Sequence, residues 1–241
     1  MIILAYKVIY YSTVCYNKCM IKLFKQLLDF IYKKRCYFCK NALSGKRMCD
    51  KCFNKIPKFP YKCIKRIKNI EIYCVTLYKD ETQKLIRAVK YHDQKDLAYY
   101  QAKMMYDFWV KVENPNREFF IVPVPMHPER EKERTYNHME LVAQEFIKIA
   151  GDNYKIEKNL IKRIKNTKPQ YNLSKKEREE NLKDAFALCE NYQDFKNKKI
   201  LIFDDIFTTG STMQEMIKTF KDKGVNDLYV LITSCSEYNI S

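Results

Sequence analysis

The fold is decided by residues 200–212, which read ILIFDDIFTTGST. The four apolar residues 200–203 have the character of a central parallel strand that is buried on both faces. Two carboxylates, Asp204 and Asp205, follow this strand, and a turn rich in hydroxyl groups then opens an amphipathic helix. This order of strand, acid pair, polar turn and helix predicts a parallel α/β sheet with a ligand site at the carboxyl end of the strand.

The turn after the acid pair has the chemistry of a phosphate site. At the first turn of a helix, the free backbone N–H groups and the positive end of the helix dipole favour an anion. Gly210 lets the backbone approach a ligand without a Cβ in the way. Asp204 and Asp205 can accept hydrogen bonds from the 2- and 3-hydroxyls of a ribose, while Mg²⁺ binds substrate oxygens nearby. Further donors come from the hydroxyl groups of Thr208, Thr209, Ser211 and Thr212.

This arrangement resembles the signature of the type I phosphoribosyltransferases over all of residues 200–212. Thr and Ser residues that cap an ordinary helix would explain the hydroxyl groups but not the acid pair. The resemblance implies an α/β fold with a mainly parallel sheet flanked by helices. It also implies a pocket for phosphoribosyl pyrophosphate or a related ribose 5-phosphate, in which Asp204 and Asp205 serve an Mg²⁺-dependent transferase.

The second part of the chain alternates between strand and helix patterns, as right-handed βαβ crossovers require. The segment 155–188 is weakly patterned, and its basic part up to residue 181 suits a lid over the pocket or an ordinary solvated loop. The expected strands are 72–78, 119–124, 199–203 and 228–233, and the expected helices are 81–90, 97–112, 137–150 and 211–223.

Ten cysteines are present, most of them in the first third of the chain. Two CxxC pairs, Cys36 with Cys39 and Cys49 with Cys52, are separated by nine residues. This is the spacing of a zinc ribbon, in which two tight turns bring four thiolates into one tetrahedron. We expect a structural zinc site, with disulfides or an iron–sulfur cluster as the competing interpretations. Paired cysteines of this kind indicate a reducing compartment, so we expect a cytoplasmic protein.

The N-terminal region adds a predicted helix to this ribbon. Residues 20–35 have apolar positions at three- and four-residue intervals, which predicts an amphipathic helix that packs on the protein or lies on a lipid surface. We therefore expect an N-terminal module at 20–60 and a phosphoribosyltransferase-like domain at 70–241. Residues 1–19 make a poor signal peptide, and we expect Met20 to be the working initiator. No stretch reaches the length of a membrane span.

Further segments resemble the ComF-type competence proteins, a family that includes GntX-like members. With the four-cysteine ribbon, this similarity runs from about residue 20 to residue 233. It implies a role in DNA uptake during natural transformation, with single-stranded DNA and a DNA-uptake helicase as partners. Thr135 departs from the family pattern where glycine is usual, and His138 where glutamine is usual. The matching segments are VPVPMHPER at 122–130, RTYNH at 134–138, KRIKNT at 162–167 and parts of 170–186.

Further charged residues are candidates for the same pocket. Arg130 and Arg134 lie in the loop after an expected strand, where guanidinium groups could hold a pyrophosphate by bidentate hydrogen bonds. Lys90 receives less weight than these arginines. The three histidines have no mutual spacing that suggests a metal site, and we expect each in a loop or on the surface rather than as a general base.

The net charge of +16 favours anionic partners. However, the chain has 36 lysines and only 9 arginines, and such a lysine excess can be spread over all faces. Binding of nucleic acid requires the charge to be clustered in a patch. Three functions therefore stay open. They are a phosphoribosyltransferase, a non-catalytic module that binds single-stranded DNA or a helicase, and a regulator that senses phosphoribosyl pyrophosphate.

Overall fold

The protein is described by a computed structural model that covers residues 35–41, 47–134, 136–167 and 174–236. The predicted helix at 20–35 lies outside these residues except for its last position. The chain divides into two compact units, residues 1–53 and 54–241. The second unit contains the sheet and the acid pair. One of its strands lies before residue 70, at which the second domain was expected to start.

The second unit is built on a six-stranded sheet with the order β1-β2-β8-β7-β3-β4. All pairings are parallel except that of β1 with β2. The predicted α/β fold with a mainly parallel sheet is therefore confirmed. In chain order the strands are β1 (Cys63–Ile67), β2 (Ile70–Leu77), β3 (Phe119–Pro123), β4 (Tyr154–Ile156), β7 (Ile200–Phe207) and β8 (Leu228–Cys235).

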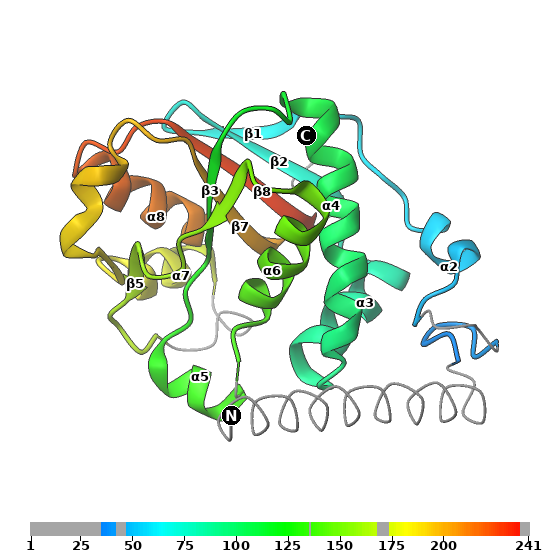
Figure 1. The fold of residues 1–241 in the computed structure, drawn as a ribbon. Helices are drawn as coiled ribbons and strands as arrows, with labels where there is room; N and C mark the ends of the chain where they lie inside the picture. The colour runs from blue at the N-terminus through cyan, green and yellow to red at the C-terminus, as the bar shows by residue number, and fades with distance from the viewer. Residues whose placement is uncertain (1–34, 42–46, 135, 168–173, 237–241) are drawn as a thin grey trace, which may run out of the picture. The chain divides into compact units, whose positions relative to one another are not determined.

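Helices cover both faces of this sheet, as the figure shows for α4 and α6 on one face and α8 on the other (Figure 1). The central strand β7 is buried on both sides because its side chains alternate between two apolar layers. Ile200 and Ile202 pack in the core with α8, whereas the ring of Phe203 lies 5.0 Å from that of Phe146 on α6. The main helices are α3 (Asp80–Tyr91), α4 (Ala98–Val112), α6 (His138–Ala150) and α8 (Ser211–Lys221).

Short elements fill the weakly patterned region between α6 and β7. Strands β5 (Ile161–Arg163) and β6 (Phe186–Leu188) pair into a separate two-stranded antiparallel sheet, and α7 (Lys175–Leu182) lies between them in the chain. Strands of three residues are too short to show a period of two in the sequence, so this pair of strands was not predicted. Strand β1 was missed as well, since it lies between the predicted modules at 20–60 and 70–241, in a basic stretch to which no element had been assigned. The remaining short elements are α2 (Asp50–Asn54), η1 (Lys95–Leu97), α5 (Pro128–Arg134) and η3 (Glu190–Phe195).

Among the helices described, none has both the length and the apolar composition that crossing a bilayer requires.

Candidate functional site

A pocket of about 790 Å³ lies beside the carboxyl end of β7. Its acidic side is formed by Asp204 and Asp205, and Thr208 and Thr212 line it near the start of α8. This is the edge at which ligands bind parallel α/β sheets. Its cationic lining consists of Arg87, Lys90, Arg130, Arg163 and Arg178. Of the described residues, five cationic and two acidic side chains border the pocket, which therefore suits an anionic ligand.

The turn between β7 and α8 requires glycine for its backbone conformation, whereas the expectation from the sequence concerned the close approach of a ligand. Gly210 has a positive φ of 83° and immediately precedes the first residue of α8. A Cβ at this position would lie 2.7 Å from Cζ of Phe207. The hydroxyls of Thr209 and Ser211 are 2.8 Å apart and hydrogen bond one another. The predicted residues are thus brought together, with Thr208 and Thr212 on the pocket and the other two hydroxyls engaged within the turn.

The strand extends further than predicted and contains the acid pair, since β7 ends at Phe207 rather than at Phe203. Because neighbouring residues of a strand point to opposite faces, the two carboxylates have different surroundings. Asp204 is half-buried, whereas the side chain of Asp205 is only 8% exposed. The peptide N–H of Asp205 donates a hydrogen bond of 2.9 Å to Oδ1 of Asp204.

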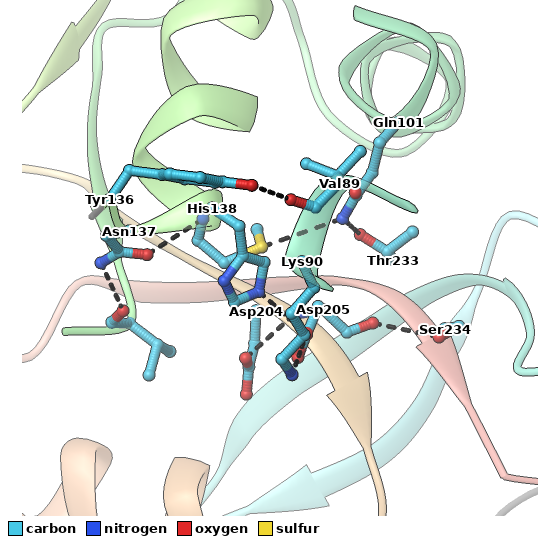
Figure 2. Close-up of polar contacts among 12 residues, drawn as sticks. Val89, Lys90, Gln101, Tyr136, Asn137, His138, Asp204, Asp205, Thr233 and Ser234 are labelled. Carbon is cyan, nitrogen blue, oxygen red and sulfur yellow. Dashed lines mark hydrogen bonds and ion pairs between the residues drawn. The ribbon is translucent and has the colours of Figure 1, made fainter. Parts of the chain in front are cut away.

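Two basic side chains converge on Asp205 (Figure 2). Nζ of Lys90 lies 2.6 Å from its Oδ2, and Nε2 of His138 lies 2.9 Å from the same oxygen. An ionised carboxylate can only accept hydrogen bonds, so the Nε2 atom of this histidine carries the proton. The expectation that His138 is a loop or surface residue was therefore wrong, and Lys90 was undervalued. In both cases the partner is more than 60 residues away in sequence.

The electrostatics of the acid pair follow from these contacts. Burial and the charge of Asp205 raise the pKa of Asp204 to about 8. Burial acts in the same direction on Asp205, but the Lys90 ammonium and His138 outweigh it and hold the pKa of Asp205 well below its usual range. Burial would lower the pKa of Lys90, and the charge of Asp205 reverses this effect and raises it. At neutral pH Asp205 is therefore ionised, whereas Asp204 readily takes up a proton.

The segment that carries His138 is tied to two further elements. The hydroxyl of Tyr136 donates a hydrogen bond of 2.5 Å to the carbonyl of Val89 near the end of α3. Asn137 caps α6, because its Oδ1 accepts the N–H of Met139 at 3.0 Å. Its Nδ2 donates to the carbonyl of Val124, just after β3. Helix α3, helix α6 and the end of β3 are thereby fixed around the acid pair.

Arginines from separate elements also line the pocket. Nη2 of Arg130 donates to the carbonyl of Thr167 at 2.5 Å, and Arg163 bonds to the hydroxyl of the same threonine. Burial and the nearby Arg130 lower the pKa of Arg163 to about 10. Nη1 of Arg178, on α7, lies 3.2 Å from the hydroxyl of Thr208. Arg134 is the last residue of α5, and its side chain lies outside the described part of the structure.

The sequence motif therefore identified the acid pair and the hydroxyl groups of the pocket but missed most of its cationic lining. Arg163 and Arg178 lie in segments that had been noted as basic and as similar to the ComF-type proteins, but neither residue had been assigned to the pocket. A local signal for Lys90 did exist, since it ends a predicted amphipathic helix close to the edge of the sheet where ligands bind. No local pattern could have paired it with an acid at residue 205.

The four paired cysteines lie together in the first unit. Their sulfur atoms all lie within 4.8 Å of one another, and those of Cys39 and Cys49 are 3.8 Å apart. The backbone N–H groups of Cys49 and Cys52 point at the sulfurs of Cys36 and Cys49, each at 3.4 Å. Burial opposes the Cys36 thiolate, but backbone N–H groups outweigh it and lower the pKa of that thiol to about 6.

This geometry fits a zinc ion. A tetrahedron with Zn–S bonds of about 2.3 Å has sulfurs about 3.8 Å apart. All four cysteines are free thiols in the structure, so the competing disulfide interpretation receives no support. Burial and the neighbouring thiols raise the pKa of Cys52 to about 12. A bound cation would relieve the repulsion between thiolates that contributes to this rise. The cluster could therefore hold zinc and form a zinc ribbon.

Comparisons with known proteins agree with the resemblance seen in the motifs. Competence protein F of Haemophilus influenzae is 28% identical over 221 residues, which cover 81% of this chain and 94% of that protein. DNA utilization protein YhgH of Salmonella typhimurium is 26% identical over 188 residues, or 76% of this chain and 75% of that protein. Competence protein ComFC of Bacillus subtilis is 27% identical over 110 residues, or 46% and 41% of the two chains. No family model matches the chain.

Proposed function

We propose that this chain, whose curated relatives support a ComF-type competence family, binds phosphoribosyl pyrophosphate or a related ribose 5-phosphate and acts in DNA uptake. The observation that carries the proposal is the junction of β7 and α8. It places Asp204, the start of a helix and the Thr208 and Thr212 side chains on one pocket that five cationic side chains also line. The names of the relatives support the role in DNA uptake.

Each part of the ligand has a partner of suitable chemistry. The start of α8 would take the 5-phosphate, because its N–H groups are not used within the helix. Asp204 would accept hydrogen bonds from the ribose hydroxyls. Arg130 and Arg163 would face the pyrophosphate, since guanidinium groups bind phosphate oxygens in bidentate fashion. A ligand with several negative charges would offset the repulsion between these two arginines.

Mg²⁺ would enter with the ligand rather than reside in the protein. The ion prefers oxygen ligands, keeps several waters and is usually bound through substrate phosphates. Asp204 is the more exposed of the two carboxylates at the pocket. The Mg²⁺ would reduce the charge of the pyrophosphate and favour its departure, if the bound ligand undergoes transfer to an acceptor.

Calorimetric titration tests the binding proposal. Phosphoribosyl pyrophosphate with Mg²⁺ is titrated into the wild type and into Asp204→Asn, with ribose 5-phosphate and pyrophosphate as truncated ligands. We expect the wild type to bind the complete ligand more tightly than either fragment, and the variant to lose about 100-fold in affinity. Asp227→Asn is the matched control, because Asp227 pairs with Lys199 near the opposite end of β7.

A folded, zinc-replete wild type that binds none of these ligands would contradict the proposal. Binding to single-stranded oligonucleotides would then become the leading function. Its affinity should fall steeply with rising salt if phosphate contacts carry it.

A further inference from the structure

The two neighbouring acids at the end of β7 are in different chemical situations. Asp204 is half-buried at the pocket, and its side chain accepts a hydrogen bond from the N–H of the next residue. Asp205 is held through one oxygen by Lys90 on α3 and His138 on α6. Its backbone carbonyl also accepts a hydrogen bond of 3.0 Å from the hydroxyl of Ser234 on β8.

We propose that the acid pair is divided in function: Asp204 contacts the ligand, whereas Asp205 is a positioning residue that Lys90 and His138 hold in place. The proposal rests on the proposed function, because it states how that pocket treats the ribose hydroxyls. It differs from the sequence-based expectation, in which both carboxylates receive hydrogen bonds from the sugar.

The anchored carboxylate is poorly available to a ligand. Two donors occupy a single oxygen of Asp205, and only 8% of its side chain is exposed. A sugar hydroxyl that displaced Lys90 would leave this ammonium, on a side chain that is only 18% exposed, without its anion. Breaking a buried ion pair in this way is strongly unfavourable. A ribose hydroxyl is a neutral donor and would not compensate for that loss.

The anchored residue can nevertheless orient its neighbour. The N–H of Asp205 donates to Oδ1 of Asp204 at 2.9 Å, so the position of one peptide group fixes the carboxyl group that faces the pocket. Residue 205 is held through its side chain by Lys90 and His138, and its carbonyl, which belongs to the next peptide group, accepts the hydroxyl of Ser234. The chain of contacts thus runs from two helices and a strand through Asp205 to the ligand-binding oxygen atoms (Figure 2).

The hydrogen bond that His138 donates to Asp205 could also come from another side chain. The role of His138 here is to donate one hydrogen bond from Nε2, which a glutamine amide could also supply without a group that titrates near neutral pH. Leucine has a comparable bulk but no donor. His138→Gln and His138→Leu therefore separate the donated hydrogen bond from simple packing. His92→Leu is the control, because His92 is exposed and lies two residues after Lys90.

The test measures affinity for phosphoribosyl pyrophosphate with Mg²⁺ in folded, zinc-replete full-length variants. We expect Asp204→Asn to lose about 100-fold. Asp205→Asn, Lys90→Met and His138→Leu should each lose about tenfold, as residues that orient a ligand-binding group do. His138→Gln should stay within about threefold of the wild type, and the double variant Asp205→Asn/His138→Leu should lose no more than the larger single loss.

Two outcomes would overturn the division of roles. One is a loss of affinity in Asp205→Asn that equals or exceeds the loss in Asp204→Asn. The other is full additivity of the Asp205→Asn and His138→Leu losses, which would mean that the histidine does not act through this acid.

Thermal unfolding supplies a readout that needs no ligand. We expect Asp205→Asn and Lys90→Met to lower the Tm at pH 7, because each leaves a buried partner uncompensated, and Asp204→Asn not to lower it. If the wild type binds no ribose phosphate, the proposed function fails while this comparison still tests which acid is anchored. If the wild type binds and the two acids behave alike in both measurements, the division of roles alone fails.

Discussion

The four-cysteine cluster and the acid-pair pocket differ in how their groups are brought together. The cluster takes its four sulfurs from residues 36–52, so two local turns suffice to gather them. The pocket takes its lining from residues as far apart as 78 and 236, and its geometry depends on the sheet and on both helical layers. A locally built site should fail when its own residues change, whereas an assembled site should also respond to changes in the elements that support it.

The largest effect is expected at the cluster. Replacing Cys36 and Cys52 together by serine should reduce bound zinc from one equivalent to none, with loss of a binding free energy of about 10–16 kcal/mol. Metal analysis of the purified protein measures this directly. Cys189→Ser is the control, because this cysteine lies in the second unit, outside the cluster. Zinc that persists in the double variant would show that the local turns do not define the site.

A second effect concerns pH and belongs to Asp204. Its pKa is raised to about 8 in the folded protein against an ordinary value near 3.8, so the folded state binds a proton more tightly than the unfolded chain. Stability from this group is therefore complete below pH 4 and falls as pH rises toward 8. We expect Asp204→Asn to gain on the order of 4 kcal/mol over the wild type between pH 4 and pH 9, measured by denaturant unfolding. A constant difference would contradict the raised pKa.

The third effect tests the close approach in the phosphate turn. Gly210→Ala should cost about 3 kcal/mol of unfolding free energy, because it combines a positive φ with a contact of 2.7 Å to the ring of Phe207. Gly224→Ala is the matched control. It has a similar φ of 79°, but its Cβ would meet the side chain of Lys196 at an ordinary 3.6 Å. Equal losses in the two variants would assign the whole effect to backbone strain.

The same difference between local and assembled sites explains what could be predicted from the sequence. The cysteine spacing and residues 200–212 are local patterns, and both led to the groups that the structure brings together. The main helices and strands followed from hydrophobic periodicity for the same reason. The predicted end of β7 was wrong, because two adjacent acids resemble the end of a strand when their buried partners are unknown.

Lys90, His138 and Arg163 show where local patterns stop being informative. Each reaches its place through the packing of α3, α6 or the β5–β6 pair. Lys90 had received less weight than Arg130, His138 had been expected in a loop or on the surface, and Arg163 had not been assigned to the pocket. A buried ion pair between residues 90 and 205 leaves no trace in either segment alone. A prediction of such pairs requires the strand order and the faces on which the helices pack, which composition and spacing do not provide.

The smallest effect is expected at Asn137, which supports the pocket without lining it. Asn137→Ala should cost about 1–2 kcal/mol, because it removes the cap of α6 and a hydrogen bond to the carbonyl of Val124. Asn114→Ala is the control, since its side chain accepts a similar backbone hydrogen bond in an exposed turn.

Asn137→Asp should recover the cap but not the donor to Val124. If it restores stability while ligand affinity stays low, the contact between elements matters to the pocket beyond its contribution to folding. If both recover together, the cap alone accounts for Asn137, and the support for the pocket is more local than the structure suggests.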